Sequence, residues 1–179
     1  MIVMAMTASL MASTGCSDAR GERRVQATYD KTTGKLSQLT VDVVKDGKPN
    51  ITSYMDGTKF LRIEVDSNED GKIDRWEYYG ADQKLERVGL SRANDGKADA
   101  WAFQGPNGSM ARLEVSTKRD GTANRTEFYE NGALTRAEED TDADGRVDKW
   151  EQYESGALVS VSFDTAKSGK PTTTIDYRK

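Results

Sequence analysis

The feature that most constrains the fold is an internal repeat of 24 or 25 residues. Each copy carries a glycine in a polar segment, preceded by aspartate in the first five copies and by serine in the last. These glycines are Gly47, Gly71, Gly96, Gly121, Gly145 and Gly169. Five residues after each glycine the chain places tryptophan or threonine, which keeps step with the repeat. Self-similarity at this period indicates that one small structural unit is stacked several times.

Each unit predicts two short strands joined by a turn. In residues 72–79, "KIDRWEYY", the side chains of Asp74, Trp76 and Tyr78 fall on one face and those of Arg75 and Glu77 on the other. This period of two is typical of a strand, and the turn "GADQK" leads to a second alternating run, "LERVGL". The sequence therefore predicts an all-β fold, an antiparallel β-meander of about six hairpin repeats. We expect an elongated, curled sheet, with a closed barrel as the alternative.

Composition supports a thin sheet and excludes several function classes. Hydrophobic residues make up 35% of the 179 residues and charged residues 31%, which is too polar for a thick core. The net charge of −4 disfavours binding to nucleic acid, because phosphate contacts need a basic surface. The chain has no histidine, so the commonest general base is missing. No pair of carboxylates stands out from the repeat, and we therefore expect a protein that is not an enzyme.

The N-terminal stretch "MIVMAMTASLMASTG" is apolar, uncharged and too short to span a bilayer. It is typical of an export signal, which gives a signal peptide at 1–15, a linker at 16–24 and a repeat domain at 25–179. The residues Ser13, Thr14 and Gly15 before Cys16 resemble the lipobox of bacterial lipoproteins. That resemblance implies cleavage before Cys16, lipidation of Cys16 and attachment to a membrane of the cell envelope. Ser17 is compatible with sorting to the outer membrane, and an ordinary cleaved signal peptide is the alternative.

Two repeats carry a complete acidic loop at the glycine. The segment "DTDADGRVDKWE", residues 140–151, resembles the calcium-binding loop of EF-hand proteins, which places oxygen ligands at positions 1, 3, 5, 7, 9 and 12. The resemblance implies calcium as the ligand, held by Asp140, Asp142, Asp144, Arg146 through its carbonyl, Asp148 and Glu151. In the second repeat the same positions are Asp66, Asn68, Asp70, Lys72, Asp74 and Glu77. Strands flank both loops here, where EF-hand proteins have helices.

The alternative reading is an acidic turn that binds no metal. An Asp-Gly pair suits a hairpin turn, and aspartate side chains cap turns without a metal. At positions 1, 3 and 12 the other four repeats have few acids, and the third has Ser91, Ala93 and Ala102. We therefore interpret Asp140, Asp142, Asp148 and Glu151 as surplus to the hairpin. Clustered carboxylates repel one another unless a cation offsets them, which favours calcium.

The same face of the predicted sheet carries Trp76, Trp101 and Trp150, which are candidates for stacking against a sugar or peptide ligand. Packing between neighbouring strands is the other interpretation. Arg87, Arg112 and Arg136 also recur with the repeat and are expected to pair with acids such as Glu114 and Glu138. The sequence thus predicts a non-enzymatic, lipid-anchored calcium-binding module that binds an unknown protein or glycan or acts as a scaffold. The alternatives are a metal-free glycan- or peptide-binding module and an immunity-type protein.

Overall fold

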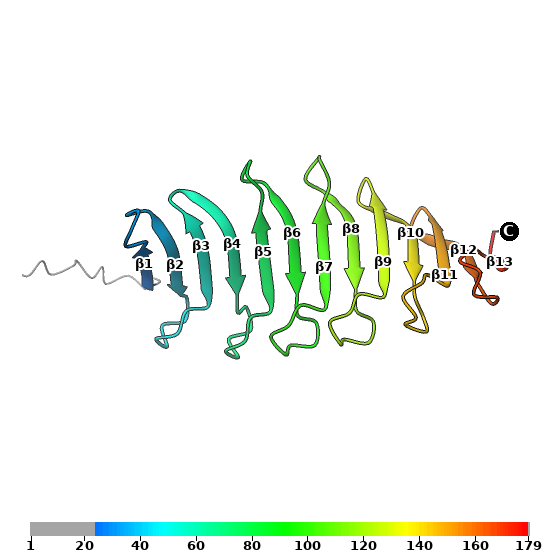
Figure 1. Cartoon of the computed structure of the whole chain (residues 1–179), viewed down its shortest axis with the longest axis horizontal. Coiled ribbons are helices and arrows are strands. Elements are labelled where there is room, and N and C mark those ends of the chain that lie inside the picture. The colour runs from blue at the N-terminus through cyan, green and yellow to red at the C-terminus, as the bar shows by residue number, and fades with distance from the viewer. Residues whose placement is uncertain (1–23, 179) are drawn as a thin grey trace, which may run out of the picture.

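The computed structural model describes residues 24–178, which form one antiparallel sheet. The order of the strands in space is their order in the chain, so every strand pairs with its sequence neighbours (Figure 1). The strands are β1 (Arg24–Tyr29), β2 (Leu36–Asp42), β3 (Ile51–Asp56), β4 (Lys59–Val65), β5 (Arg75–Tyr79), β6 (Leu85–Leu90), β7 (Ala100–Gln104), β8 (Met110–Val115), β9 (Arg125–Glu130), β10 (Ala133–Glu139), β11 (Lys149–Glu154), β12 (Ala157–Phe163) and β13 (Thr173–Asp176).

The sheet is open and elongated. Strands β1 and β13 lie at opposite ends of the molecule (Figure 1), and contacts between elements occur only between consecutive strands. The expected meander of hairpin repeats is therefore confirmed, and the closed barrel is wrong. The described part of the chain is free of helices, so it holds none long and apolar enough to cross a membrane. The predicted signal peptide and the lipidation site at Cys16 lie outside the described residues.

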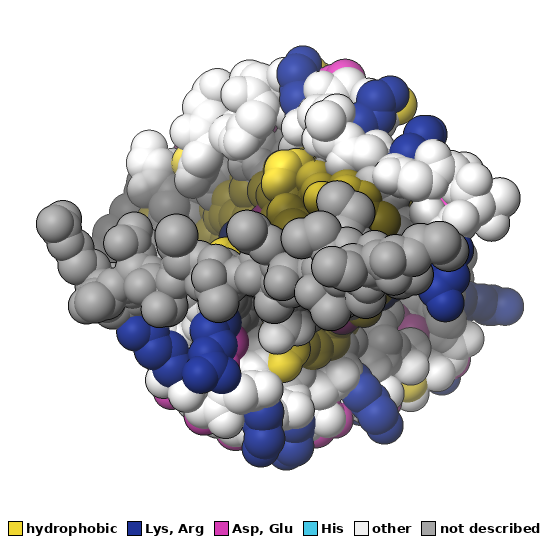
Figure 2. Space-filling view, turned by 90° about the vertical axis from the view of Figure 1, so that its left-hand side faces the viewer, with side chains coloured by type: hydrophobic (Ala, Val, Ile, Leu, Met, Phe, Trp, Pro, Cys, Tyr) yellow, Lys and Arg dark blue, Asp and Glu magenta, His cyan; other side chains and the backbone are white. Residues whose placement is uncertain are grey.

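The two faces of the sheet differ in chemistry. The buried hydrophobic side chains all point to one side, which we call the apolar face; they are Met55, Val88, Ala100, Val115, Ala137 and Val161. Seen from the end at which β1 lies, hydrophobic side chains gather in a central hollow (Figure 2). The opposite side, which we call the ladder face, carries alternating aromatic residues and arginines. A single layer with one apolar face explains how so polar a chain folds.

The glycine of each repeat lies in a long loop at one end of the strands, while short turns join the strands at the other end (Figure 1). Gly145 has a φ of 88°, and nothing lies within 4 Å of the place where a Cβ would stand. The position therefore needs glycine for its backbone conformation and not for lack of space. Two residues earlier, Ala143 also has a positive φ of 64°. This pair of left-handed residues bends the chain back toward the next strand.

Candidate metal centre

The first residue of each acidic loop is a cap for the turn. Asp140 accepts hydrogen bonds from the backbone N–H groups of Ala143 at 2.7 Å, Asp144 at 3.2 Å and Gly145 at 2.7 Å. Asp66 does the same for its own loop, with the N–H of Gly71 at 2.8 Å. Where the third and fourth repeats have serine at this place, the hydroxyl accepts from the loop N–H instead. A hydrogen-bond acceptor at this position is thus part of every described turn of the series.

The ninth residue of the loop is a second cap. Asp148 accepts from the backbone N–H of Thr141 at 3.0 Å and from its hydroxyl at 2.8 Å. Asp74 makes the corresponding two bonds, and Asn50 and Asn124 accept the same backbone bond as neutral amides. The interpretation of Asp140 and Asp148 as surplus to the hairpin is therefore wrong. The turn uses an acceptor at both places, although it does not need a charge at either.

The fifth repeat nevertheless concentrates carboxylates. Among the described residues, Asp140, Asp142 and Asp148 are the one group of three metal-ligating side chains with ligand atoms all within 4.8 Å of one another. Asp142 distinguishes this loop from the others, because the sister repeats have an uncharged residue or a lysine at the third loop position. Asp144 accepts from the N–H of Arg146 at 3.0 Å, and both residues line a cavity of about 30 Å³ beside the cluster.

A cation from the next repeat already approaches this cluster. The ammonium nitrogen of Lys167 lies 2.7 Å from Asp142 Oδ2 and 3.7 Å from Asp144 Oδ2. The hydrogen bond from Lys167 holds the pKa of Asp142 below its ordinary value, and the same bond raises the pKa of Lys167. The geometry attracts positive charge to the mouth of the loop, on the side that faces the following loop.

The second repeat is arranged differently. Asn68 donates from Nδ2 to Asn94 Oδ1 at 2.9 Å, and Asn94 donates to Asp70 Oδ2 at 2.7 Å. Lys72 reaches over to the backbone carbonyl of Asn94 at 3.1 Å. Hydrogen bonds from Lys72 and Asn94 keep the pKa of Asp70 below its ordinary value. The predicted ligands Asn68 and Asp70 are thus tied to the neighbouring loop, and this repeat forms no cluster of three carboxylates.

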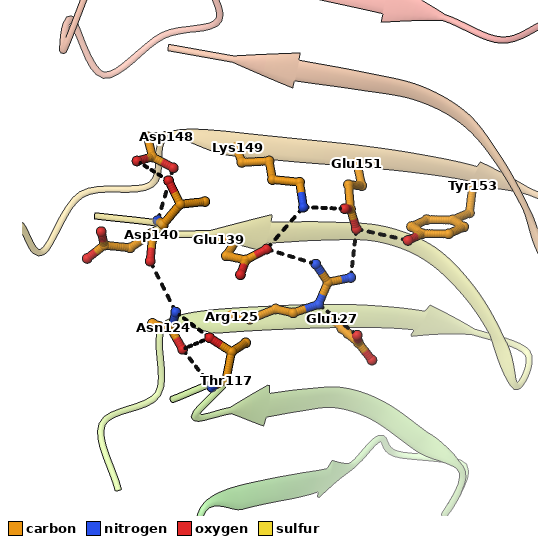
Figure 3. Close-up of polar contacts among 11 residues, drawn as sticks. Thr117, Asn124, Arg125, Glu127, Glu139, Asp140, Asp148, Lys149, Glu151 and Tyr153 are labelled. Atoms are coloured by element: carbon orange, nitrogen blue, oxygen red, sulfur yellow. Dashed lines mark hydrogen bonds and ion pairs between the residues drawn. The ribbon is translucent and has the colours of Figure 1, made fainter. Parts of the chain in front are cut away.

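The structure does not bring the predicted twelfth ligand to either loop. Glu151 lies in β11 on the apolar face, where it is 8% exposed and accepts from Arg125 at 2.6 Å, Lys149 at 2.8 Å and Tyr153 at 2.8 Å (Figure 3). Glu77 likewise binds its strand neighbours Arg75 and Tyr79, at 2.8 and 2.7 Å. A strand residue projects perpendicular to the sheet, so its carboxylate cannot turn back to the loop before it.

Glu151 belongs to a charge network that the sequence analysis missed. Arg125 pairs with Glu127 at 2.9 Å, Glu139 at 3.2 Å and Glu151 at 2.6 Å, while Lys149 also binds Glu139 at 3.2 Å (Figure 3). Burial raises the pKa of Glu151, but the hydrogen bonds from Arg125, Lys149 and Tyr153 outweigh it and lower the pKa to about 2. Burial lowers the pKa of Arg125, and its bonds to Glu151 and Glu127 outweigh that effect and raise it. The recurring spacing of a basic residue two places before Glu77, Glu127 and Glu151 was the available signal.

The three tryptophans lie on the ladder face, as their equivalent positions in the repeat predict. Trp76 in β5 is directly opposite Gly89, and Gly89 is directly opposite Trp101 in β7. Trp150 in β11 stands apart, between Glu138 and Ser162. The predicted stripe is therefore one pair of nearby indoles and one distant indole.

Comparison with known proteins establishes no specific function. No family model matches the chain, and no curated protein matches it. Among solved structures, one similar to this chain is that of accessory secretory protein 1, 2 and 3 of Streptococcus pneumoniae, at 17% identity and a TM-score of 0.31, covering 58% of this chain. Another is that of a mutant of TarM from S. aureus with Fondaparinux, alpha-GlcNAc-glycerol and UDP, at 12% identity and a TM-score of 0.30, covering 67% of this chain. The match spans 17% of the first protein and 20% of the second.

One expectation needs correction. The sequence predicts a protein that is not an enzyme, but neither the structure nor these matches supports that conclusion, and we withdraw it. At these TM-scores the likeness assigns no activity to this chain.

Proposed function

We propose that this chain is an exported, lipid-anchored β-repeat protein that binds calcium and presents its sheet as a binding or scaffold surface. The observation that carries the calcium proposal is the cluster of Asp140, Asp142 and Asp148 at the mouth of the fifth long loop. Carboxylate oxygens are the ligands that calcium prefers, and it tolerates flexible coordination. The approach of Lys167 to Asp142 indicates that the cluster attracts a cation, and bound calcium would displace this ammonium group from Asp142.

In this proposal calcium is held by Asp140, Asp142, Asp144 and Asp148, with the carbonyl of Arg146 as a further oxygen. Asp66, Asn68, Asp70, Lys72 and Asp74 form a second, weaker candidate. Because Glu77 and Glu151 are held by basic neighbours, each loop offers fewer ligands than an EF-hand. The affinity should therefore lie in the range of extracellular modules, with a dissociation constant of about 10⁻⁴–10⁻³ M.

Calcium at 10 mM is expected to stabilise the protein by about 1 to 3 kcal/mol relative to the same protein in chelator. The variant D140S/D142A/D148N should remove most of the effect, leaving only that of the weaker second loop. Its replacements are the residues Ser91, Ala93 and Asn124 that sister repeats carry at these three positions. Each replacement keeps the side chain that a sister turn uses, so the turn should still fold. Thermal unfolding followed by circular dichroism, with calcium and with chelator, measures both results.

The matched control is Asp99→Asn in the third repeat, where Asp99 caps Arg92 and Ala93 in a loop without the other acids. It makes the same exchange of carboxylate for amide, and we expect it to leave the calcium response unchanged. Identical melting curves of the unaltered protein with calcium and with chelator would remove the metal from the proposal.

The lipid anchor is tested separately. Cys16→Ser is expected to move the protein from the detergent phase to the aqueous phase in Triton X-114 partitioning of whole cells, because the thiol that receives the lipid is lost. Labelling with radioactive palmitate should disappear in the same variant. Ser17→Ala is the control and should stay labelled. A Cys16→Ser protein that still partitions into detergent would show that the attachment lies elsewhere.

A further inference from the structure

Arginines alternate with aromatic residues across the ladder face, and each is directly opposite the next. The row runs through Tyr54, Arg62, Tyr78, Arg87, Phe103, Arg112, Phe128 and Arg136. The guanidinium carbons lie over the rings at 4.3 Å for Arg62 and Tyr54, and at 4.1 Å for Arg112 and Phe103. These are cation–π contacts, and they recur with the repeat.

Three of the four arginines also bind a carboxylate of their own strand. Arg62 pairs with Glu64 at 3.0 Å and Arg112 with Glu114 at 3.1 Å, and Arg136 pairs with Glu138. In each case the glutamate follows two residues after the arginine and lies on the same face. The ordinary unit of this face is therefore a guanidinium that stacks on a ring and holds a carboxylate.

Arg87 departs from this unit. The residue two places on is Gly89, and no carboxylate of the described residues lies within 4.0 Å of Arg87, in contrast to its three sisters. A Cβ on Gly89 would lie 2.7 Å from the ring of Trp101, so that indole takes the space of the missing glutamate. Arg87 stacks on Tyr78 at 4.4 Å and on Trp101 at 4.9 Å. Arg87 therefore stacks on aromatic rings as the other three arginines do, but in the described part of the chain it has no glutamate as an ion-pair partner.

Four aromatic side chains surround this cation. Tyr78 and Phe103 stand directly opposite Arg87 on either side, and Trp76 and Trp101 stand opposite Gly89 in the neighbouring row. The rings of Tyr78 and Trp101 are 6.0 Å apart. Two strand spacings separate β5 from β7, so the platform is about 10 Å wide. Within residues 24–178 no other strand covers it, because contacts between elements occur only along the sheet.

We propose that Trp76, Tyr78, Arg87 and Trp101 form a binding site for a sugar that carries a carboxylate. The carboxylate would supply the anion that Glu64, Glu114 and Glu138 supply in the sister units. Because Trp101 fills their position beside Arg87, the carboxylate would approach from the open side of the sheet and accept bidentate hydrogen bonds from the planar guanidinium. The apolar C–H face of the sugar ring would lie on the indoles, which offer flat apolar area at little cost in side-chain entropy. A flat platform suits a ring better than a peptide side chain, which needs a pocket.

The test is a titration of tryptophan fluorescence with digalacturonic acid, using its dimethyl ester as the neutral match. All samples contain chelator, so that calcium cannot bridge the sugar to the acidic loops. The unaltered protein should bind the acid and not the ester. Arg87→Gln should weaken binding by about 10- to 100-fold, since it removes a charged hydrogen bond. Arg112→Gln, which changes an arginine already paired with Glu114, should leave binding within about twofold.

Any of three results in this titration would overturn the proposal: no saturable binding of the acid, equal binding of acid and ester, or equal loss in the two arginine variants. An acidic peptide that binds more tightly than the sugar at the same platform would also overturn it, by assigning the site to another class of ligand. Thermal unfolding of both variants without ligand shows that they are folded, so a loss of binding by Arg87→Gln alone supports the site.

Discussion

Replacing Arg125 with alanine is expected to lower the free energy of unfolding by about 3–5 kcal/mol. The Arg125 side chain is 15% exposed, and its guanidinium binds three carboxylates, those of Glu127, Glu139 and Glu151. Without it, three acids on neighbouring strands would face one another with Lys149 as the remaining partner. Half-buried like charges that are offset by a single lysine remain costly, so the loss in free energy exceeds that of a simple contact. Urea unfolding followed by tryptophan fluorescence measures it.

Arg75→Ala is the matched control, because Arg75 occupies the same place in the second repeat. Its side chain is 44% exposed and pairs with Glu77 alone. Exposed pairs of this kind contribute about 1 kcal/mol or less. A loss in Arg125→Ala no larger than in Arg75→Ala would contradict the role of the network, and both values come from the same unfolding experiment.

Acid should destabilise the protein as the pH falls from about 4.5 towards about 2. The ordinary pKa of 4.5 applies to Glu151 in the unfolded chain, and its network lowers the pKa to about 2 in the folded protein. The stabilisation from Glu151 is therefore complete above the unfolded value and is lost as the pH falls toward the folded value. It amounts to up to about 3 kcal/mol. Urea unfolding at intervals of half a pH unit measures the slope.

Glu151→Gln should be less stable than the unaltered protein at pH 7, and its stability should fall less steeply in acid. The control is Glu130→Gln, because Glu130 is exposed at the end of β9 and has no ion pair among the described residues. It should reproduce the slope of the unaltered protein. If Glu151→Gln and Glu130→Gln gave the same slope, the acid response would have to come from other carboxyls.

The sequence predicts the fold well because the same pattern of strand and turn residues recurs in every repeat. The alternation in residues 72–79 and the glycine at each long loop are enough to predict strands and turns, and the structure has both. The absence of closure is harder to predict. Whether the sheet closes depends on the twist angle between neighbouring hairpins, and no single residue of the repeat determines that angle.

The candidate site is predicted only in part. A loop motif lists which oxygens are present, and it does not say what else they bind. Asp148 and Asp140 serve the turn as caps, Asp142 contacts Lys167 from another repeat, and Glu151 is held by Arg125, which lies 26 residues away. Contacts between repeats decide the ligand set, so comparison of aligned positions within one loop misses them.

The chain of neighbour-only contacts has a consequence for how the molecule comes apart. Because none of the thirteen described strands contacts a strand other than its neighbours in the sheet, stability is close to a sum of local terms along the sheet. Unfolding is then expected to begin with dissociation of an outer strand and to spread strand by strand. It should slow where side-chain contacts join several strands and raise the local stability. The ion pairs of Arg125 join β9, β10 and β11, so we expect these strands in the C-terminal half to be the last to unfold.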